Sequence, residues 1–330
     1  MNARIVRFHQ TGGPEVLKIE TVDVPTPVSG EVRIRVKALG LNRAEVMFRS
    51  GQYLEQPIFP ARLGYEAAGI VESIGSGVEG LAVGDAVSTA PAFSLNQYGV
   101  YGELAVVPAT AVMKHPPSLS WQQAAAVWMQ YLTAYGALIG IADIKAGETV
   151  LIPAASSSVG IAASQIANMI GAIPIALTRS QTKRRALMNL GFKHVIATDE
   201  QDLVAEVRKL TAGKRARVVF DPVGGPTVAK LTAAMAERGI LFQYGALSTE
   251  PTPLPLMDVL GKSLTIRGYV LHEITTDLSQ LKRAEQFVVG GLSSGKLTPV
   301  IARTFSLDQI VDAHRYLESN TQIGKIIVTV

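Results

Sequence analysis

The sequence predicts an α/β protein in which a doubly wound parallel sheet is joined to a smaller β-rich domain. Short strand patterns crowd the first third of the chain, whereas strand and helix patterns alternate from Glu148 onwards. The first alternating unit is a strand, a tight turn of small residues and a helix, which is typical of a nucleotide-binding sheet. A chain of 330 residues is long enough for two such domains.

The first part of the chain, residues 1–124, is predicted to form many short strands. Turns at Gly12-Gly13-Pro14 and Pro25-Thr26-Pro27 separate its first three strand patterns, and in the third Val32, Ile34 and Val36 alternate with basic residues. Closely spaced short strands favour a small barrel or sandwich. The predicted strands are Arg4–Phe8, Leu17–Val22, Glu31–Ala38 and segments within 67–75, 85–90 and 101–109.

A helical segment is predicted to begin after Ser120. This serine is the expected N-cap of the segment WQQAAAVWMQYLTAYGALI, and Gln123 stands at the capping-box position. The segment leads into the alternating part of the chain.

From Glu148 onwards, strand and helix patterns follow one another as two βαβαβ halves of a doubly wound sheet. Gly171, Gly191, Gly213 and Gly239 mark predicted helix ends. The predicted strands are Thr149–Ile152, Ile173–Thr178, Val195–Ala197, Val218–Asp221, Ile240–Tyr244 and Leu264–Val270, and the helices are Val159–Ile170, Gln181–Leu190, Leu203–Leu210 and Thr227–Ala236. A helix at Leu278–Gly290 and a strand at Lys325–Val330 complete the chain.

The turn after the strand Thr149–Ile152 is the first candidate binding feature. Its small residues allow a close backbone approach to a pyrophosphate, and the N–H groups at the start of the following helix bind such an anion. The glycine fingerprint G-x-G-x-x-G is absent, and only Gly160 stands at its last position. By itself, the turn is equally compatible with a serine-capped helix that binds no ligand.

The composition excludes several classes of function. The chain has no cysteine, which excludes disulfides, iron–sulfur clusters, thiolate catalysis and cysteine-ligated zinc. A net charge of +4 without basic runs gives no indication of nucleic-acid binding. No apolar run approaches the roughly 18 residues that span a membrane, and the N-terminus lacks the apolar core of a signal peptide. We therefore expect a cytoplasmic protein with neither a nucleic-acid nor a membrane partner.

Short sequence strings in a specific order carry a family resemblance. They are Gly40–Glu45 (GLNRAE), Gly64–Gly69 (GYEAAG), Val83–Asp85 (VGD), Tyr131–Tyr135 (YLTAY), Ala146–Glu148 (AGE), Asp221–Gly225 (DPVGG) and Ile323–Ile327 (IGKII). Together they resemble the medium-chain dehydrogenase/reductase superfamily and, within it, the zinc-free quinone oxidoreductases, which include zeta-crystallin-like proteins. The resemblance implies a Rossmann-like doubly wound parallel sheet plus a GroES-like β-barrel substrate domain. It divides the chain into residues 1–124 (first part of the catalytic domain), 125–265 (NADPH-binding domain) and 266–330 (return segment completing the catalytic domain).

The departures from the zinc-dependent members are equally informative. Those enzymes use a Cys, a Gly-His-Glu and a later Cys at the catalytic metal. Here the position of the first Cys falls near Asn42, and Tyr65 stands at the position of the His. The cysteine-rich lobe that binds the structural zinc is missing. The five histidines have no metal-ligand spacing, so we expect no metal site and a metal-free mechanism.

The resemblance assigns the turn to a dinucleotide. The family sequence A-x-x-G-x-x-G corresponds here to Ala154-x-x-Ser157-x-x-Gly160, and Ser157 and Ser158 still offer N–H and hydroxyl donors. The residues expected at the pyrophosphate are Ser157, Ser158, Val159 and Gly160.

The end of the second strand predicts which dinucleotide binds. An NAD enzyme usually carries an acidic residue there for the ribose 2′-hydroxyl, but the segment Ala176–Ser180 has none. A 2′-phosphate can instead be held by cationic side chains. The resulting prediction is NADPH, with Thr178, Arg179, Ser180 and Lys183 as cofactor residues and Arg184 nearby. The alternative is a basic first helical turn on a solvated face.

Other cofactor contacts are implied by the resemblance and by the rule that ligands lie beyond the carboxyl ends of parallel strands. Thr133 of the LTAY string is expected near the nicotinamide. Asn42 and Lys325 are further candidates, although Lys325 and Asn320 are equally compatible with a structural role. The residues that follow the fifth and sixth strands, Gly245, Ala246, Leu247 and Val270, are expected near the nicotinamide ribose.

The predicted chemistry is hydride transfer to a quinone or an α,β-unsaturated carbonyl. Negative charge then builds on the carbonyl oxygen of the acceptor, and a hydrogen-bond donor there lowers the barrier. The resemblance places Asn42 and Tyr53 at the active cleft, Tyr53 either as proton donor or as pocket wall. Tyr65 and Trp128 are interpreted as apolar walls or core residues. Arg43 and Glu45 are interpreted as a surface pair.

The predicted function is thus that of a zinc-independent NADPH-dependent quinone or enone oxidoreductase. Two alternatives stay open: an enoyl-thioester reductase or dehydratase-like member, and a non-enzymatic NADPH-binding protein, such as a lens-type structural protein or an RNA-binding or redox-sensing relative. The sixth strand, Leu264–Val270, is apolar and free of proline and ends the sheet on the family's strand order. A bare edge invites pairing with a second copy, so we expect a homodimer.

Overall fold

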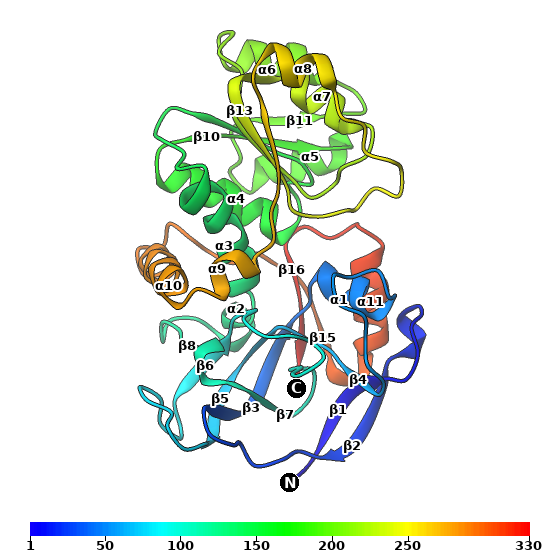
Figure 1. Cartoon of the computed structure of the whole chain (residues 1–330), viewed down its shortest axis with the longest axis vertical. Helices are drawn as coiled ribbons and strands as arrows, with labels where there is room; N and C mark the ends of the chain where they lie inside the picture. The colour runs from blue at the N-terminus through cyan, green and yellow to red at the C-terminus, as the bar shows by residue number, and fades with distance from the viewer. The chain divides into compact units, whose positions relative to one another are not determined.

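The computed structural model covers Met1 to Val330, and the chain forms two compact units (Figure 1). Unit 1 comprises Met1–Met129, Thr275–Arg283 and Pro299–Val330, and unit 2 comprises Gln130–Ile274 and Ala284–Thr298. The chain passes between the units within α3 (Trp128–Tyr135), close to but not at the expected boundary after residue 124. Part of the expected return segment, Ala284–Thr298, groups with unit 2.

Unit 1 is built mainly of antiparallel strands. The alternation expected in the third strand is present, because Val32, Ile34 and Val36 are all buried. The larger sheet has the order β15 (Ile301–Ser306), β16 (Lys325–Thr329), β3 (Glu31–Gly40), β5 (Glu66–Ile74), β6 (Ala86–Thr89), β8 (Val112–Lys114), with β7 (Leu104–Pro108) also paired to β3. The smaller sheet has the order β2 (Lys18–Asp23), β1 (Asn2–Phe8), β4 (Ala61–Arg62).

Unit 1 also contains elements that the sequence analysis missed. They are the helices α1 (Arg43–Arg49) and α11 (Ile310–Glu318) and the strands β4, β8 and β15. Short helical turns lie at η1 (Pro14–Val16), η2 (Ala109–Ala111), α2 (Trp121–Ala124) and η4 (Leu307–Gln309).

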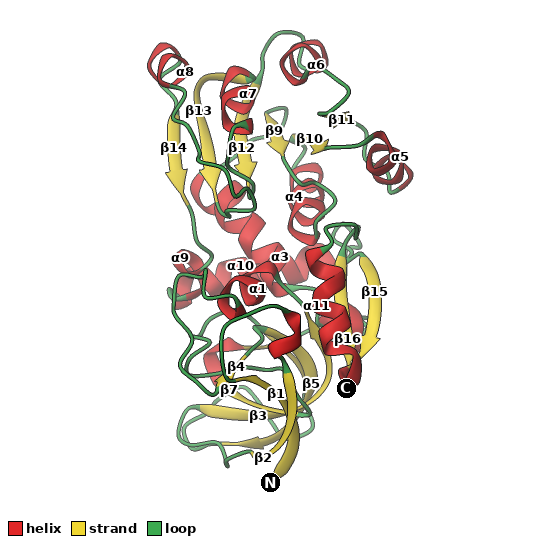
Figure 2. Cartoon of the chain, turned by 90° about the vertical axis from the view of Figure 1, so that its right-hand side faces the viewer, coloured by secondary structure: helices red, strands yellow, loops and turns green.

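Unit 2 contains the predicted doubly wound sheet (Figure 2). Its six parallel strands have the order β11 (Val195–Ala197), β10 (Ile173–Thr178), β9 (Thr149–Ile152), β12 (Ala216–Asp221), β13 (Met235–Gln243), β14 (Thr265–Gly268), which confirms the predicted fold class. The chain order reverses between β9 and β12, and ligands bind beyond the carboxyl ends of strands at such a point. The helices are α4 (Ser158–Met169), α5 (Gln181–Asn189), α6 (Leu203–Leu210), α7 (Thr227–Ala233) and α8 (Leu256–Gly261).

Two local predictions in unit 2 are wrong. The helix expected at Thr227–Ala236 ends at Ala233 because β13 already begins at Met235. For the same reason Gly239 lies within β13 and does not end a helix. By contrast, Gly171 and Gly191 have positive φ angles just after α4 and α5, and Gly213 has one in the turn that follows α6, as the sequence indicates.

The segment Trp121–Ile141 links the units through α2, α3 and the π-helical turn η3 (Gly136–Ile141). Its capping box is confirmed: the Gln123 N–H donates to Ser120 Oγ at 3.2 Å, and the Ser120 N–H donates to Gln123 Oε1 at 3.0 Å. Contrary to expectation, this segment is long and apolar enough to cross a membrane by length and composition alone. Because 83% of its most apolar window is buried inside the protein, it has the character of a core helix. The remaining helices, α9 (His272–Thr275) and α10 (Leu278–Ser293), follow β14.

Candidate cofactor and active site

The turn after β9 is shaped by one serine and one glycine. Ser157 caps α4, and its Oγ accepts the Gly160 N–H at 3.0 Å. A Cβ at Gly160 would lie 2.6 Å from the Ala155 Cα, so only glycine fits the close approach of turn and helix. Ser157, Ser158 and Val159 are half-buried, and the N–H groups of a first helical turn have no acceptor within the helix. The turn therefore has the geometry of an anion site.

Two cations lie beside this turn. Lys183 Nζ donates to Ser156 Oγ at 3.1 Å, and Ser180 caps α5 by accepting the Lys183 N–H at 3.4 Å. Burial and the neighbouring Arg179 lower the pKa of Lys183. Adjacent positive charges at the start of α5 are suited to a phosphate group.

The neighbours of these cations have different roles. Ser156 was missed by the sequence analysis, although the run of three serines was the signal for it. Arg184 Nε donates to the Val195 carbonyl at 2.9 Å, so this side chain joins α5 to β11. Thr178 is buried at the end of β10, and its carbonyl accepts the Thr198 N–H at 2.8 Å.

The loops after β12 and β13 are tied together. The N–H groups of Leu247 and Ser248 donate to the carbonyls of Pro222 and Val223 at 3.0 and 2.9 Å. The loop that contains Gly245, Ala246 and Leu247 is thereby fixed at the carboxyl ends of these strands. Val270 is exposed after β14, and Thr133 is buried in α3.

The Asp221 carboxylate closes the turn after β12. It accepts the N–H groups of Val223 and Gly224 at 2.8 and 3.0 Å. Burial raises the pKa of Asp221 to about 6, and the two backbone hydrogen bonds oppose this shift. Asp221 therefore titrates well above an ordinary aspartate while it holds the turn.

In unit 1, Asn42 is at the centre of a buried hydrogen-bond network. Its N–H donates to Glu45 Oε2 at 2.6 Å, and its Nδ2 donates to Glu45 Oε1 at 3.1 Å and to Glu66 Oε2 at 3.2 Å. Lys325 Nζ donates to Asn42 Oδ1 at 2.5 Å and to Glu66 Oε2. Asn42, Glu66 and Lys325 are all buried, so this network joins the start of α1 to β5 and β16.

The interpretation of Arg43 and Glu45 as a surface pair is wrong. Glu45 is fully buried and accepts the Tyr101 hydroxyl at 2.7 Å and the Tyr65 N–H at 3.0 Å. Burial raises the pKa of Glu45, and the hydrogen bonds and Lys325 oppose this shift. Arg43 instead donates to the Leu317 carbonyl at 3.0 Å and to Asn320, which gives Asn320 a structural contact.

Tyr53 lies on the loop after α1. It is half-buried and packs edge-on against Phe48, with ring centroids 6.5 Å apart. Burial raises the pKa of Tyr53, and a hydrogen bond from Tyr65 partly offsets this. The buried Tyr65 hydroxyl also has a raised pKa, through burial and the proximity of Tyr53. Trp128 is a core residue whose Nε1 donates to Ser88 Oγ at 2.7 Å.

The loop after α1 is pinned by Glu55. Its carboxylate accepts the Ser94 hydroxyl at 2.5 Å and the Leu95 N–H at 2.8 Å. Leu54 and Ile58 are nevertheless largely exposed on this loop. A fixed loop therefore presents apolar side chains next to Tyr53.

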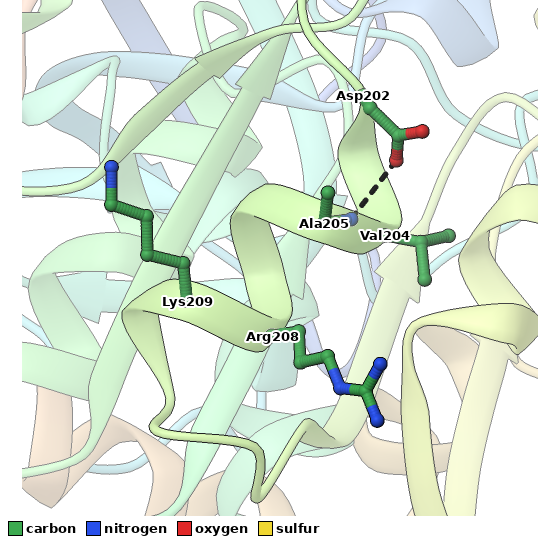
Figure 3. A pocket seen from close by; sticks show the side chains of 5 residues that line it. All are labelled: Asp202, Val204, Ala205, Arg208 and Lys209. Carbon is green, nitrogen blue, oxygen red and sulfur yellow. Dashed lines mark hydrogen bonds between the residues drawn. The ribbon is translucent and has the colours of Figure 1, made fainter.

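A surface hollow and the distribution of possible metal ligands point to no other site. No three or more His, Cys, Asp or Glu side chains are grouped so that they could hold a metal ion. A shallow hollow on α6 is lined by Asp202, Val204, Ala205, Arg208 and Lys209 (Figure 3). Asp202 accepts the Ala205 N–H at 2.9 Å, as an ordinary N-cap does, and the hollow contains none of the predicted site residues.

The predicted site residues are divided between the two units. Asn42, Tyr53 and Lys325 belong to unit 1. The structure brings Ser157 to Gly160 together with Arg179, Ser180 and Lys183 in unit 2, and the other predicted cofactor residues also belong to that unit. Glu45, Glu66 and Tyr101 complete the unit 1 network without having been predicted as site residues.

Comparisons with known proteins identify the family. Residues 28–117 match the family model described as "Alcohol dehydrogenase GroES-like domain", and residues 158–288 match that described as "Zinc-binding dehydrogenase". The human quinone oxidoreductase is 31% identical over 328 residues, which is 98% of this chain and 97% of that protein. The 2-haloacrylate reductase of a Burkholderia species is 30% identical over 329 residues, covering 97% of each.

A solved structure agrees with these sequence matches. The crystal structure of Escherichia coli quinone oxidoreductase complexed with NADPH has a TM-score of 0.90 and 31% identity, and the match covers 99% of this chain and 100% of that one. The resemblance stated from the sequence is therefore confirmed. The chain belongs to the quinone oxidoreductase family of the medium-chain dehydrogenase/reductase superfamily.

Proposed function

We propose that this protein is an NADPH-dependent, zinc-independent oxidoreductase that transfers hydride to a quinone or an α,β-unsaturated carbonyl. The observation that carries the proposal is the pair of cations, Arg179 and Lys183, beside the serine turn of the doubly wound sheet. A carboxylate at this place would repel a 2′-phosphate, whereas these side chains attract it. The NADPH complex of the Escherichia coli relative supports the same cofactor.

The names of the relatives support a conjugated acceptor. One is a quinone oxidoreductase and another a 2-haloacrylate reductase, so the two names specify a C=C bond conjugated to a ketone carbonyl and to a carboxylate, respectively. Hydride addition to such an acceptor moves negative charge onto the carbonyl oxygen. The apolar side chains of Leu54 and Ile58, on the fixed loop next to Tyr53, favour an acceptor with apolar surface over a sugar.

Each unit contributes a separate task in this proposal. Bound NADPH supplies the hydride. Ser157 to Gly160 hold the pyrophosphate, while Thr178, Arg179, Ser180 and Lys183 select the 2′-phosphate. The buried Thr133, together with Gly245, Ala246, Leu247 and Val270, orients the nicotinamide end. Tyr53 donates a hydrogen bond to the acceptor oxygen, and Asn42 and Lys325 keep the surrounding backbone in place.

The test is oxidation of NADPH, followed by its absorbance, with one panel of quinones and one of enones. Turnover with simple quinones or enones supports the proposal, and turnover confined to enoyl thioesters supports the enoyl reductase alternative. Tight NADPH binding without turnover on any acceptor would leave the non-enzymatic alternative.

The assembly proposed for the protein is a homodimer through β14. This strand pairs only with β13, and Ile266 is exposed on it. The neighbouring surface is strongly apolar, since the segment that leads through α8 exposes Leu254, Leu256, Met257 and Leu260. An unpaired edge beside apolar surface is suited to a second copy of the same strand.

Light scattering at micromolar concentration tests this assembly. The wild type is expected to have the mass of a dimer, and an Ile266→Lys/Leu260→Lys variant that of a monomer. Val83→Lys changes an apolar residue of unit 1 that is about as exposed as Leu260, and it should leave the mass unchanged. A monomeric wild type would contradict the dimer.

A further inference from the structure

Two carboxylates and one ammonium group are buried together in unit 1. The exposed fractions of Glu45, Glu66 and Lys325 are 0%, 1% and 1%. Lys325 Nζ pairs with Glu66, and all four carboxylate oxygens accept hydrogen bonds from within the protein. Removing such charges from water costs free energy, and their mutual attraction and hydrogen bonds offset this cost only in part. Apolar side chains of similar size would avoid the cost. Stability alone therefore does not explain why these charges are buried here.

The charges fix one orientation of the Asn42 amide. Its oxygen accepts Lys325 Nζ at 2.5 Å, and its nitrogen donates to the Gly40 carbonyl at 3.1 Å and to the carboxylates of Glu45 and Glu66. Rotating the amide by half a turn would place its oxygen against two carboxylates and its hydrogens against an ammonium group. Lys325 and the two carboxylates thus hold the amide from opposite sides.

The same carboxylates hold backbone that carries the proposed site residues. Glu66 accepts the Met129 N–H at 2.9 Å in the first turn of α3, the helix that contains Thr133. Glu45 accepts the Tyr65 N–H at 3.0 Å, while Asn42 caps α1, which leads directly into the loop of Tyr53. Three segments with proposed roles are therefore joined to one charged cluster.

The strand beside the cluster leaves room for the lysine. A Cβ at Gly40 would lie 2.8 Å from Lys325 Cε and 2.0 Å from the Ala125 carbonyl oxygen. Any side chain at this position would displace the stem of Lys325 from its path to Asn42. The contact between Lys325 and Asn42 therefore depends on a glycine at position 40.

We propose that Lys325 is a positioning residue for hydride transfer, which acts through Asn42 and Glu66 on the backbone of α1 and α3. The inference rests on the function proposed above. Lys325 touches neither the acceptor nor the cofactor in this role. Its charge sets the geometry in which Thr133 and Tyr53 are presented, and small displacements of such groups are costly to the rate.

The decisive variant removes both charges of the pair. Lys325→Met alone leaves two buried carboxylates without their cation and should lower the thermal unfolding temperature sharply. Glu66→Gln/Lys325→Met restores the net charge of the wild-type cluster, with Glu45 as its one carboxylate, and should regain most of that temperature. Because Asn42 Oδ1 still lacks its donor, kcat should remain about 10- to 100-fold low, with KM for NADPH within about twofold. A double variant with regained stability and the wild-type kcat would overturn the proposal.

A milder variant keeps the test decisive if the double variant does not fold. Tyr101→Phe removes one donor to Glu45, and Tyr98→Phe removes a tyrosine donor to the carboxylate of Glu31 at 2.9 Å, outside the network. Only Tyr101→Phe should lower kcat, by about threefold or more, at unchanged KM for NADPH. Equal kcat values for the two variants would contradict a positioning network.

Amide hydrogen exchange separates this inference from the function on which it rests. In the double variant, the N–H groups of Asn42, Tyr65 and Met129 should exchange faster than in the wild type. In Tyr101→Phe, only those of Asn42 and Tyr65 should exchange faster. A wild type without turnover on any acceptor would refute the oxidoreductase function alone. Unchanged exchange at these groups would refute the positioning role whatever the activity.

Discussion

Gly136 and Tyr269 are packed against each other without room for a methyl group: a Cβ at Gly136 would lie 2.1 Å from the Tyr269 hydroxyl oxygen and 2.5 Å from Ile274 Cγ1. Gly136 begins the π-helical turn η3, and Tyr269 is buried directly after β14. The pair fixes how the end of the sheet packs on the linking helix within unit 2.

Gly136→Ala should therefore destabilise unit 2 by about 1–3 kcal/mol, the usual cost of overpacking a core. Gly140→Ala lies in the same turn but meets nothing closer than 3.7 Å, so it should be neutral or slightly stabilising because alanine favours a helix. Urea unfolding of the two variants measures the difference. Similar stabilities for both would show that Tyr269 moves away at little cost.

Cofactor selection is predicted to depend on Arg179 and Lys183. The wild type should bind NADPH more tightly than NADH, because charge-assisted contacts to the 2′-phosphate contribute roughly 1.5–3 kcal/mol each. An Arg179→Ala/Lys183→Ala variant should lose most of this preference and keep its affinity for NADH. Fluorescence titration of both cofactors gives the four dissociation constants. Equal affinities in the wild type would disprove the assignment.

Tyr53 is predicted to act as a hydrogen-bond donor to the acceptor oxygen and not only as a pocket wall. If its hydroxyl donates to the acceptor oxygen, Tyr53→Phe should lower kcat on the order of tenfold to a thousandfold with little change in NADPH affinity. Asn42→Ala should instead lower turnover for every acceptor alike, because it disturbs backbone geometry. The assay needs an enone as well as a quinone, since readily reduced quinones need little proton donation. A neutral Tyr53→Phe with both would assign the proton to water.

Turnover is predicted to be independent of metal ions. The chain has no cysteine, and no acidic or histidine cluster is arranged to bind a metal. Activity should survive dialysis against a strong chelator, and elemental analysis should find no stoichiometric zinc. Bound zinc whose removal abolishes turnover would contradict this.

His314 is predicted to make the protein acid-sensitive. It is fully buried, Arg49 donates to its Nδ1 at 3.0 Å, and burial together with the charges of Arg49 and Arg43 lowers its pKa to about 3 from the ordinary 6.5. Below pH 6.5 the unfolded chain binds a proton that the folded one rejects, so this residue lowers the unfolding free energy by about 2 kcal/mol between pH 7 and 5. His314→Gln retains an acceptor for Arg49 and should reduce that loss in urea unfolding.

Acidification changes the contribution of Asp221 to stability in the opposite direction to that of His314, so Asp221 serves as the matched comparison. Its folded pKa of about 6 exceeds the ordinary 3.8, so the folded state takes up the proton first, and its contribution to stability improves as the pH falls from 6 towards 3.8. Asp221→Asn should therefore make the wild-type loss of stability on acidification larger. If neither variant changes the pH dependence of the unfolding free energy, both groups have ordinary pKa values because water reaches them in solution.

The features that the sequence predicted well are local ones. The strand Thr149–Ile152, its serine turn and the capped helix after it are consecutive, so their periodicity and small residues are directly readable. The doubly wound parallel sheet of unit 2 was predictable because βαβ crossovers leave few alternatives. The placement of Lys183 near the serine turn follows the same logic, since both come after adjacent strands, although its contact with Ser156 was missed.

The unit 1 network could not be found in the same way. Glu66 and Lys325 are separated by 259 residues, and no periodic pattern brings them together. A local signal existed for Glu45, because Asn42-x-x-Glu45 is a capping box at the start of α1, but the short helix was not predicted. Glu45 was therefore interpreted as an exposed charge next to Arg43. Buried polar clusters are set by tertiary contacts, which a single sequence does not contain.

The discontinuity of unit 1 has a consequence for how the protein is made. Translation delivers most of unit 2, Gln130–Ile274, as one continuous segment, and this part completes its parallel sheet while the C-terminal strands are still inside the ribosome. Glu45 and Glu66 emerge early, but their cation, Lys325, follows Glu66 by 259 residues. The N-terminal β-rich part thus has to keep these carboxylates hydrated until β16 pairs with β3, which completes a unit that the early strands began.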